Sequence, residues 1–480
     1  MKEQAFNPYL PNYEYVPDGE PYVFDNRVYV YGSHDRFSGV HYCENDYVCW
    51  SAPIDNLCDW RNEGIIYKKT QDPLGQKGDR LLFAPDVQKG HDGRYYLYYA
   101  LDFSSNISVA VCDRPAGKYV FYGHIHYKDG TILGTREDDI FQFDPGVLVD
   151  DDGKVYLYSG FCPPNFPWKK LDAQTKPNKG GMVVELQTDM ITIKEDPKYI
   201  FPDKLHGKGT DFEGHEFFEA SSMRKLGDTY YFVYSSINGH ELCYATSKSP
   251  ISNFQFRGTI VSNGDIYMNG RTEENALNYT GNNHGSIVEI NENWYIFYHR
   301  QTNKNQYSRQ ACAERIQIER DGSIRQVEMT SCGLNDGALE GIGEYAASIA
   351  CNLMSMTGAI PYDNGNKINA SHPYFTQEGQ DRDENPNQYI ANMSNGAIAG
   401  FKYFRFIDTR KIFIKVRGYG IGEIQVSTAI GSDLVARVVI SPSQEWKVFQ
   451  EDLKIDNGIN ALYFTYIGIG AIDLYSFTLI

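Results

Sequence analysis

Residues 143–160 read FDPGVLVDDDGKVYLYSG, which is an acid, a short apolar run, a tight polar turn and a strand rich in aromatic residues. Apolar runs on both sides of such a turn are typical of a β-hairpin. The same order recurs in PDGEPYVFDNRVYVYGSHD (17–35), APDVQKGHDGRYYLYYALD (84–102), FEASSMRKLGDTYYFVYSS (218–236) and NHGSIVEINENWYIFYHR (283–300). The recurrence predicts five copies of one structural unit.

The spacing of these hairpins indicates how large each unit is. One tyrosine recurs in the second strand of every copy, at intervals of 60 to 75 residues: Tyr29, Tyr96, Tyr156, Tyr231 and Tyr295. A second strand pair follows each hairpin, at 46–67, 107–125, 180–200, 241–261 and 309–329. Two hairpins in each of five units predict a five-bladed β-propeller over residues 1–335. A β-sandwich or several small sheets is the alternative, and the even spacing argues against it.

The repeat stops near residue 335. A stretch rich in small residues follows, and we expect residues 336–366 to be a linker. Short alternating runs such as KIFIKVRGYG (411–420) and IDLYSFTLI (472–480) then indicate a second all-β region. The prediction for residues 336–480 is a separate domain, a jelly-roll β-sandwich.

Composition limits the classes of partner. The 480 residues hold 45 Lys and Arg against 62 Asp and Glu, a net charge of −17, which disfavours nucleic acid and anionic lipid as partners. No run approaches the roughly 20 apolar residues that cross a bilayer, and the first residues lack the apolar core of a secretion signal. We therefore expect a cytoplasmic protein that binds a small molecule or an oligosaccharide. Nine cysteines without metal-ligand spacing predict reduced, packed thiols and no metal site.

The repeat also places polar residues in register. Ten to twelve positions before each recurring tyrosine stand four acids and one histidine: Asp18, Asp86, Asp144, Glu219 and His284. A lone carboxylate in a turn is usually solvated or caps a backbone N–H. Equivalent positions of a propeller converge on its axis, however, and clustered carboxylates push their pKa values apart. One acid and one base in a cleft rich in tyrosine is the apparatus of glycosidic bond hydrolysis.

These motifs resemble glycoside hydrolase family 43, five-bladed propeller enzymes that act on glycans containing arabinose and xylose, over about residues 7–330. The resemblance implies an inverting hydrolase that releases terminal L-arabinofuranose, D-xylose or both from arabinoxylan- or arabinan-derived oligosaccharides. It implies that Asp18 is the general base, that Asp144 raises the pKa of the acid and orients it, and that Glu219 is the general acid. Two neighbours compete for these roles: Glu20 as the base, and Glu216 as the acid.

The resemblance also implies further site residues. Phe83 and Asp86 belong to the second-blade motif FAPDV, which in the family lines the cleft and positions the sugar or neighbouring side chains, so Asp86 is expected to support the site and not to transfer a proton. His284 matches a histidine near the axis, for which a structural hydrogen-bonding role is favoured, and Arg309 matches an arginine that reaches the sugar or the acid. Trp168, in the loop FCPPNFPWKK, is a candidate to line a sugar pocket. The resemblance implies that no cofactor is required. Whether a structural Ca²⁺ binds near the axis or in the sandwich domain stays an open question.

The C-terminal region resembles a family 6 carbohydrate-binding module, and there we expect Trp446 to be a core residue. A non-catalytic sugar-binding propeller is the main alternative function. A retaining fructan-type propeller hydrolase is disfavoured, because its Asn-Asp-Pro-Asn and Arg-Asp-Pro motifs are missing from the sequence. The sequence leaves open the choice between arabinose and xylose, exo or endo action, and the oligomeric state.

Overall fold

The computed structural model describes residues 4–102, 104–163, 178–362, 371–383 and 386–480. Within these ranges the regular elements are β-strands and short 3₁₀ turns, which confirms the all-β class. The 3₁₀ turns are Lys69–Gln71, Asn263–Asp265, Met268–Gly270, Glu273–Asn275 and Ala347–Ile349. In this part of the chain, no helix has the length and apolar character to span a bilayer.

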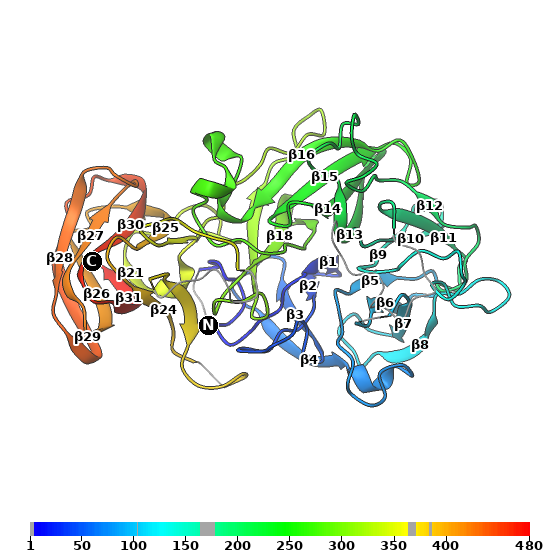
Figure 1. Cartoon of the computed structure of the whole chain (residues 1–480), viewed down its shortest axis with the longest axis horizontal. Coiled ribbons are helices and arrows are strands. Elements are labelled where there is room, and N and C mark those ends of the chain that lie inside the picture. The colour runs from blue at the N-terminus through cyan, green and yellow to red at the C-terminus, as the bar shows by residue number, and fades with distance from the viewer. Residues whose placement is uncertain (1–3, 103, 164–177, 363–370, 384–385) are drawn as a thin grey trace.

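The N-terminal two thirds of the chain form five antiparallel sheets, each built from strands that are consecutive in sequence (Figure 1). Each sheet keeps its strands in chain order. The first sheet holds β1 (Glu20–Phe24), β2 (Arg27–Tyr31), β3 (Tyr47–Pro53) and β4 (Arg61–Tyr67), and the second holds β5 (Asp86–Lys89), β6 (Tyr95–Ala100), β7 (Ile107–Cys112) and β8 (Val120–His124). The third holds β9 (Gly146–Val149), β10 (Val155–Ser159), β11 (Met182–Leu186) and β12 (Lys198–Tyr199). The fourth holds β13 (Phe217–Leu226), β14 (Thr229–Ser236), β15 (Glu241–Ser247) and β16 (Gln255–Ser262), and the fifth holds β17 (Ile287–Ile290), β18 (Asn293–Arg300) and β19 (Gln310–Ile316).

The hairpin β9–β10 shows why the quoted motif folds as it does. Val149 pairs with Val155, and the Asp150 N–H donates to the Lys154 carbonyl at 2.8 Å. Gly153 in this turn has φ of +85°, a conformation that a residue with a Cβ rarely adopts. The DDDG sequence therefore closes the hairpin, and the flanking apolar residues enter the core.

First strands of neighbouring sheets are in contact, β1 with β17, β5 with β9, and β9 with β13, and β1, β5, β9 and β13 lie close together (Figure 1). Gly19 and Gly285, which lie just before β1 and β17, form a parallel bridge. Gly146 lies so close to β13 that a Cβ would stand 2.3 Å from the Ser221 carbonyl oxygen. The residues that precede these strands in sequence therefore lie close together.

The fifth sheet differs from the sequence-based expectation. Three of its strands are present among the described residues, and the stretch expected to form the second hairpin contributes β19 and then only isolated bridges, at Ile318–Ile324 and Val261–Val327. The Val327 N–H donates to the Ile260 carbonyl of β16 at 2.8 Å. The chain therefore leaves the fifth sheet and runs against the fourth.

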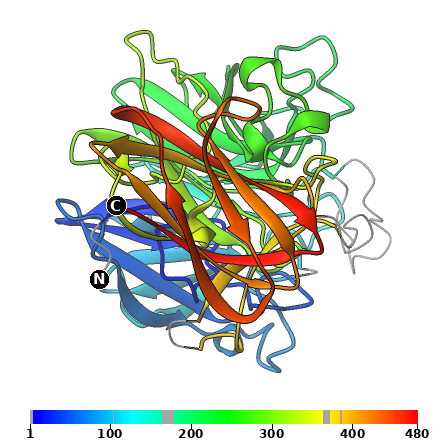
Figure 2. The ribbon, with the colours of Figure 1, turned by 90° about the vertical axis from the view of Figure 1, so that its left-hand side faces the viewer.

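The C-terminal region consists of two six-stranded sheets that enclose the largest apolar cluster of the described chain (Figure 2). One sheet holds β20 (Leu339–Glu340), β22 (Asn352–Met354), β25 (Ile398–Phe406), β27 (Ile421–Ser427), β28 (Leu434–Ile440) and β30 (Gly458–Ile469). The other holds β21 (Gly343–Ala346), β23 (Tyr374–Gln377), β24 (Gln388–Met393), β26 (Lys411–Gly418), β29 (Ser443–Asp452) and β31 (Ile472–Leu479).

Two expectations for this region are corrected. The stretch 336–366 does not serve as a free linker in its described part, because β20, β21 and β22 pair with β25 and β31. Trp446 is not a core residue. It is half-buried on the outer face of its sheet, against Tyr389 and Tyr475, with the Arg417 guanidinium 4.2 Å from its ring centroid.

Candidate active site

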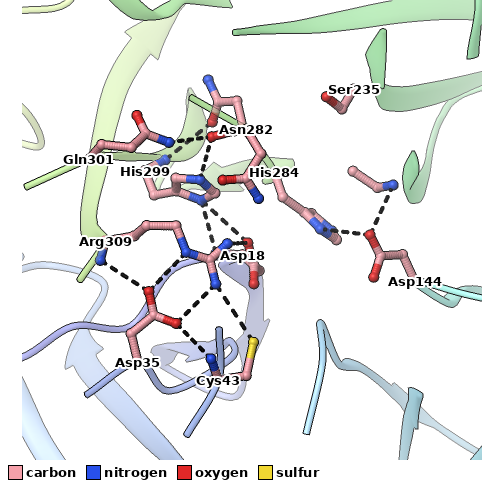
Figure 3. Close-up of polar contacts among 12 residues, drawn as sticks. Asp18, Asp35, Cys43, Asp144, Ser235, Asn282, His284, His299, Gln301 and Arg309 are labelled. Carbon is pink, nitrogen blue, oxygen red and sulfur yellow. Dashed lines mark hydrogen bonds and ion pairs between the residues drawn. The ribbon is translucent and has the colours of Figure 1, made fainter. Parts of the chain in front are cut away.

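The five polar residues that the repeat places in register all lie at the first strand of a sheet. Asp18 and Asp144 stand two residues before β1 and β9, and His284 stands three residues before β17. Asp86 begins β5, and Glu219 lies within β13. Residues far apart in sequence are neighbours here, as Figure 3 shows for Asp18, Asp144 and His284.

A cavity of about 320 Å³ opens at this centre, at the small end of the range of roughly 300–1,000 Å³ that is typical of ligand sites. Six of the predicted site residues line it: Asp18, Phe83, Asp144, Glu219, His284 and Arg309. Sequence reasoning missed the other lining residues, Tyr42, Ala84, Phe143, Phe161, Phe218, Gly239, Asn282 and Gln306. Trp168 lies outside the described residues.

Asp18 is a buried carboxylate held by a cation. Arg309 Nη1 donates to Asp18 Oδ1 at 2.9 Å (Figure 3). Burial opposes ionisation of Asp18, but Arg309, with the nearby His284, outweighs it and lowers its pKa. Asp18 is therefore ionised at neutral pH, as a general base must be.

His299 touches the same carboxylate as a neutral ring. Its Nε2 donates to the Asn282 carbonyl at 2.7 Å, and its Nδ1 accepts the Asp18 backbone N–H at 3.3 Å. Burial, with Arg309 nearby, lowers the pKa of His299 to about 3. This ring therefore positions Asp18 without adding a charge.

Arg309 is itself fixed by a second carboxylate. Its Nε and Nη2 donate to Asp35 at 2.8 and 3.0 Å, in the forked geometry that suits a guanidinium. Asp35 also accepts the Cys43 backbone N–H at 3.0 Å. Sequence analysis missed Asp35, because only the first two copies of the repeat carry an aspartate at this position, Asp35 and Asp102, and it follows the hairpin instead of preceding it.

Asp144 and His284 form the second charged pair of the cavity. His284 Nδ1 lies 3.5 Å from Asp144 Oδ2, and its Nε2 lies 3.9 Å from Glu20 Oε1. Burial alone would lower the pKa of His284, but Asp144, Asp18 and Glu20 raise it to about 9. A protonated His284 therefore balances part of the negative charge of the cavity.

Glu219 has the opposite character from Asp18. It is 8% exposed, and the register of β13 against β14 shifts on both sides of it, a bulge that re-aims a side chain. Burial and the neighbouring Asp144 raise the pKa of Glu219 well above its ordinary value. The Glu219 carboxyl therefore holds its proton to a higher pH than an ordinary glutamate does, and it faces the same cavity as Asp18.

Asp86 lies beneath the cavity and not on its wall, which corrects the expectation from the family motif. It is fully buried, accepts the Tyr22 hydroxyl at 2.7 Å, and accepts the Val147 N–H at 2.6 Å. Burial and nearby Glu20 raise its pKa to about 7. Asp86 thus links the first three sheets through β1, β5 and β9.

The two competing acids have other partners. Arg224 Nη2 donates to Glu20 at 2.7 Å, and the Ser222 hydroxyl donates to it at 3.0 Å. Glu216 accepts the Gly214 N–H at 3.1 Å. Neither Glu20 nor Glu216 lines the cavity, so the geometry favours Asp18 and Glu219 for proton transfer.

One group of metal-type ligands occurs in the described chain, outside this cavity. His215, Glu241 and Cys243 lie together at β15. Glu241 accepts hydrogen bonds from His215, Ser236 and Thr259 at 2.8, 2.5 and 2.5 Å. Hydrogen bonding within the protein therefore accounts for this cluster.

Comparison with known proteins identifies the family. The model for glycosyl hydrolases family 43 matches residues 14–324. A xylosidase/arabinosidase of Thermoclostridium stercorarium is 54% identical over 100% of this chain and 99% of its own, and one of Bacteroides ovatus is 29% identical over 61% and 87%.

Solved structures agree in fold. A family 43 β-xylosidase/α-arabinofuranosidase from a compost metagenome, solved with xylotriose, is 26% identical, with a TM-score of 0.50 over 68% of this chain and 98% of its own. An arabinoxylan arabinofuranohydrolase of Bacillus subtilis, solved with cellotetraose, is 21% identical, with a TM-score of 0.51 over 98% and 97% of the two chains. The chain belongs to glycosyl hydrolase family 43.

Proposed function

We propose that the protein is an inverting exo-glycosidase that releases terminal L-arabinofuranose and D-xylose from short oligosaccharides. One observation carries the proposal: two carboxyls whose pKa values are shifted in opposite directions, down for Asp18 and up for Glu219, line the same buried cavity. The names of the relatives support the two sugars. A non-catalytic sugar-binding protein would have no need to hold two carboxyls in opposite protonation states.

The roles follow from the two protonation states. Asp18 takes a proton from a water molecule, and the resulting hydroxide attacks the anomeric carbon as the glycosidic bond breaks. Glu219 gives its proton to the departing oxygen. Asp144 keeps Glu219 protonated through its negative charge, and His284 holds Asp144 in place. Proton transfer by these side chains needs no cofactor, and an activity assay after dialysis against a chelator tests that point and the open question of Ca²⁺.

We assign the five sheets to the five blades of a propeller whose axis passes through the cavity. The bridge between Gly19 and Gly285 supports closure of the ring between the first and fifth sheets. We further propose a catalytic domain at 1–335, a sandwich domain at 336–480, and a cytoplasmic location. Limited proteolysis with mass spectrometry tests the boundary, and cell fractionation tests the location.

The product assay tests the reaction itself. We expect incubation with xylotriose and with arabinosylated xylo-oligosaccharides to release free pentose from the chain ends. Proton NMR in the first minutes should show the anomer opposite to that of the substrate, because water enters on the face opposite the leaving group. A first product of retained configuration would contradict the inverting mechanism, and sugar binding without any pentose release would favour the non-catalytic alternative.

A second cavity adjoins the one that Asp18 and Glu219 line. This cavity of about 500 Å³ shares Tyr42, Phe83, Phe143 and Phe161 with the first and adds His41, Asp79, Leu81, Asp102, Phe141 and Tyr307. Aromatic rings are the usual platforms for sugar rings, because they cover the apolar C–H face. We propose that this cavity holds the sugar residues on the leaving-group side of the scissile bond.

Tyr307 tests this assignment, because it lines only the second cavity. We expect Tyr307→Ala to raise the KM for xylotriose about tenfold, the equivalent of about 1.4 kcal/mol of lost binding, with a smaller change in kcat. Tyr419→Ala is the matched control, since Tyr419 is 75% exposed in the C-terminal sheets. Equal KM values for wild type and Tyr307→Ala on xylotriose would contradict the proposal that the second cavity binds the leaving-group sugars.

A further inference from the structure

A loop of the C-terminal sheets packs against the loop that joins β2 to β3. The Phe37 N–H donates to Asp381 Oδ1 at 2.7 Å, and Asn45 Nδ2 donates to Asp381 Oδ2 at 3.2 Å. Phe37 and Asn45 belong to the segment 33–46, one near its beginning and one near its end. A single carboxylate therefore holds both arms of this loop, and its hydrogen bond to a backbone N–H is of the strong, charge-assisted kind.

Neighbouring contacts join the C-terminal region both to this loop and to the segment before β1. Arg382 Nη1 donates to His34 Nε2 at 2.9 Å, and Arg382 also forms an ion pair with the buried Glu14. The Tyr15 hydroxyl donates to Gln377 Oε1 at 2.6 Å. The C-terminal region is thus joined to the β2–β3 loop through His34, and to the segment before β1 through Glu14 and Tyr15.

The β2–β3 loop carries two groups of the active site. Asp35 accepts the forked hydrogen bonds of Arg309 (Figure 3). The Tyr42 ring lines the cavity, with its centroid 4.9 Å from the Arg309 guanidinium carbon. Arg309 in turn donates to Asp18. A continuous series of contacts therefore runs from Asp381 through the loop and Arg309 to the proposed base.

We propose that Asp381 is a positioning residue of the active site, which holds the β2–β3 loop so that Asp35 and Arg309 keep Asp18 in place. The inference rests on the role proposed above for Asp18. Asp381 itself is half-buried and does not line the cavity, so it acts through the loop. Small displacements of catalytic groups reduce rates steeply, since the reacting atoms must be aligned.

The expected kinetic signature follows from the groups that face Asp18. These are Arg309 and His299 in direct contact, with His284, Asp144 and Glu219 around the cavity. When the loop loosens, Arg309 stabilises the Asp18 carboxylate less. The acid limb of the pH profile of kcat/KM should then move to higher pH, while the basic limb, which belongs to Glu219, should move less, because Arg309 is only a minor cause of the pKa shift of Glu219.

Three variants form the test. We expect Asp381→Ala to lower kcat/KM on xylotriose about tenfold or more, with the acid limb displaced upward. Asp381→Asn keeps an oxygen that can accept the Phe37 N–H, so it should recover most of the activity. Glu378→Gln is the matched control: Glu378 lies in the same segment, but its partners Arg417 and Asn387 belong to the C-terminal sheets, and its kinetics should equal those of wild type.

The outcomes separate this inference from the proposed function. Asp381→Ala with wild-type kinetics and an unmoved acid limb would overturn it. A loss of activity that only follows a loss of folded protein, with the pH profile unchanged and no recovery in Asp381→Asn, would also overturn it. A wild-type enzyme that releases no pentose from any substrate would instead reject the proposed function.

Discussion

Glu219→Gln should lower kcat on xylo-oligosaccharides by about 10²–10⁴, the range that general acid catalysis contributes. The amide has the same shape but no proton to give to the leaving oxygen. Burial and Asp144 raise the pKa of Glu219, so its proton is lost only as the pH rises through that raised value. The basic limb of the wild-type pH profile should therefore disappear in the variant.

The choice of leaving group provides the control for this prediction. A dinitrophenyl glycoside departs as a stable phenolate and needs little protonation, so Glu219→Gln should cleave it at a rate much closer to wild type. Glu216→Gln should leave both substrates nearly unaffected, because Glu216 does not line the cavity. Equal losses on good and poor leaving groups would show that Glu219 is not the acid.

Asp18→Asn should abolish turnover by a similar factor on every substrate, including those with good leaving groups. The attacking water must lose a proton whichever group departs, and an amide cannot accept that proton. Because Arg309 retains Asp35 as a partner, the folded structure should survive the change. Activity is to be measured on xylotriose and on a dinitrophenyl glycoside.

Azide distinguishes a lost base from a damaged site. Azide attacks without losing a proton, so it should restore turnover of the dinitrophenyl glycoside in Asp18→Asn and yield a glycosyl azide of inverted configuration. Glu20→Gln, at the other candidate base, should show a smaller loss that azide does not relieve, since Arg224 and Ser222 hold Glu20. Rescue of Glu20→Gln but not of Asp18→Asn would reverse the two assignments.

The repeat pattern was sufficient to predict the all-β class and to bring Asp18, Asp144, Glu219 and His284 to one cavity. Local sequence signals decide a hairpin, because turn residues and alternating apolar positions act over a few residues. Residues at one phase of the repeat then become neighbours. Asp86 shares this phase but points into the protein at β5, where it binds Tyr22 and Val147. The position of a residue within the repeat predicts the strand end at which it lies. It does not predict the direction in which the side chain points.

The sequence by itself determined the strand order of five successive hairpin units and the acids that precede their first strands. Only the tertiary structure decided that Asp35, Tyr42 and His299 serve the same cavity and that Asp381 reaches it from the C-terminal sheets. Likewise, the opposite protonation states of Asp18 and Glu219 follow from burial and from Arg309, which are properties of the assembled site. Contacts between segments hundreds of residues apart carry no local pattern, because they depend on how whole sheets pack.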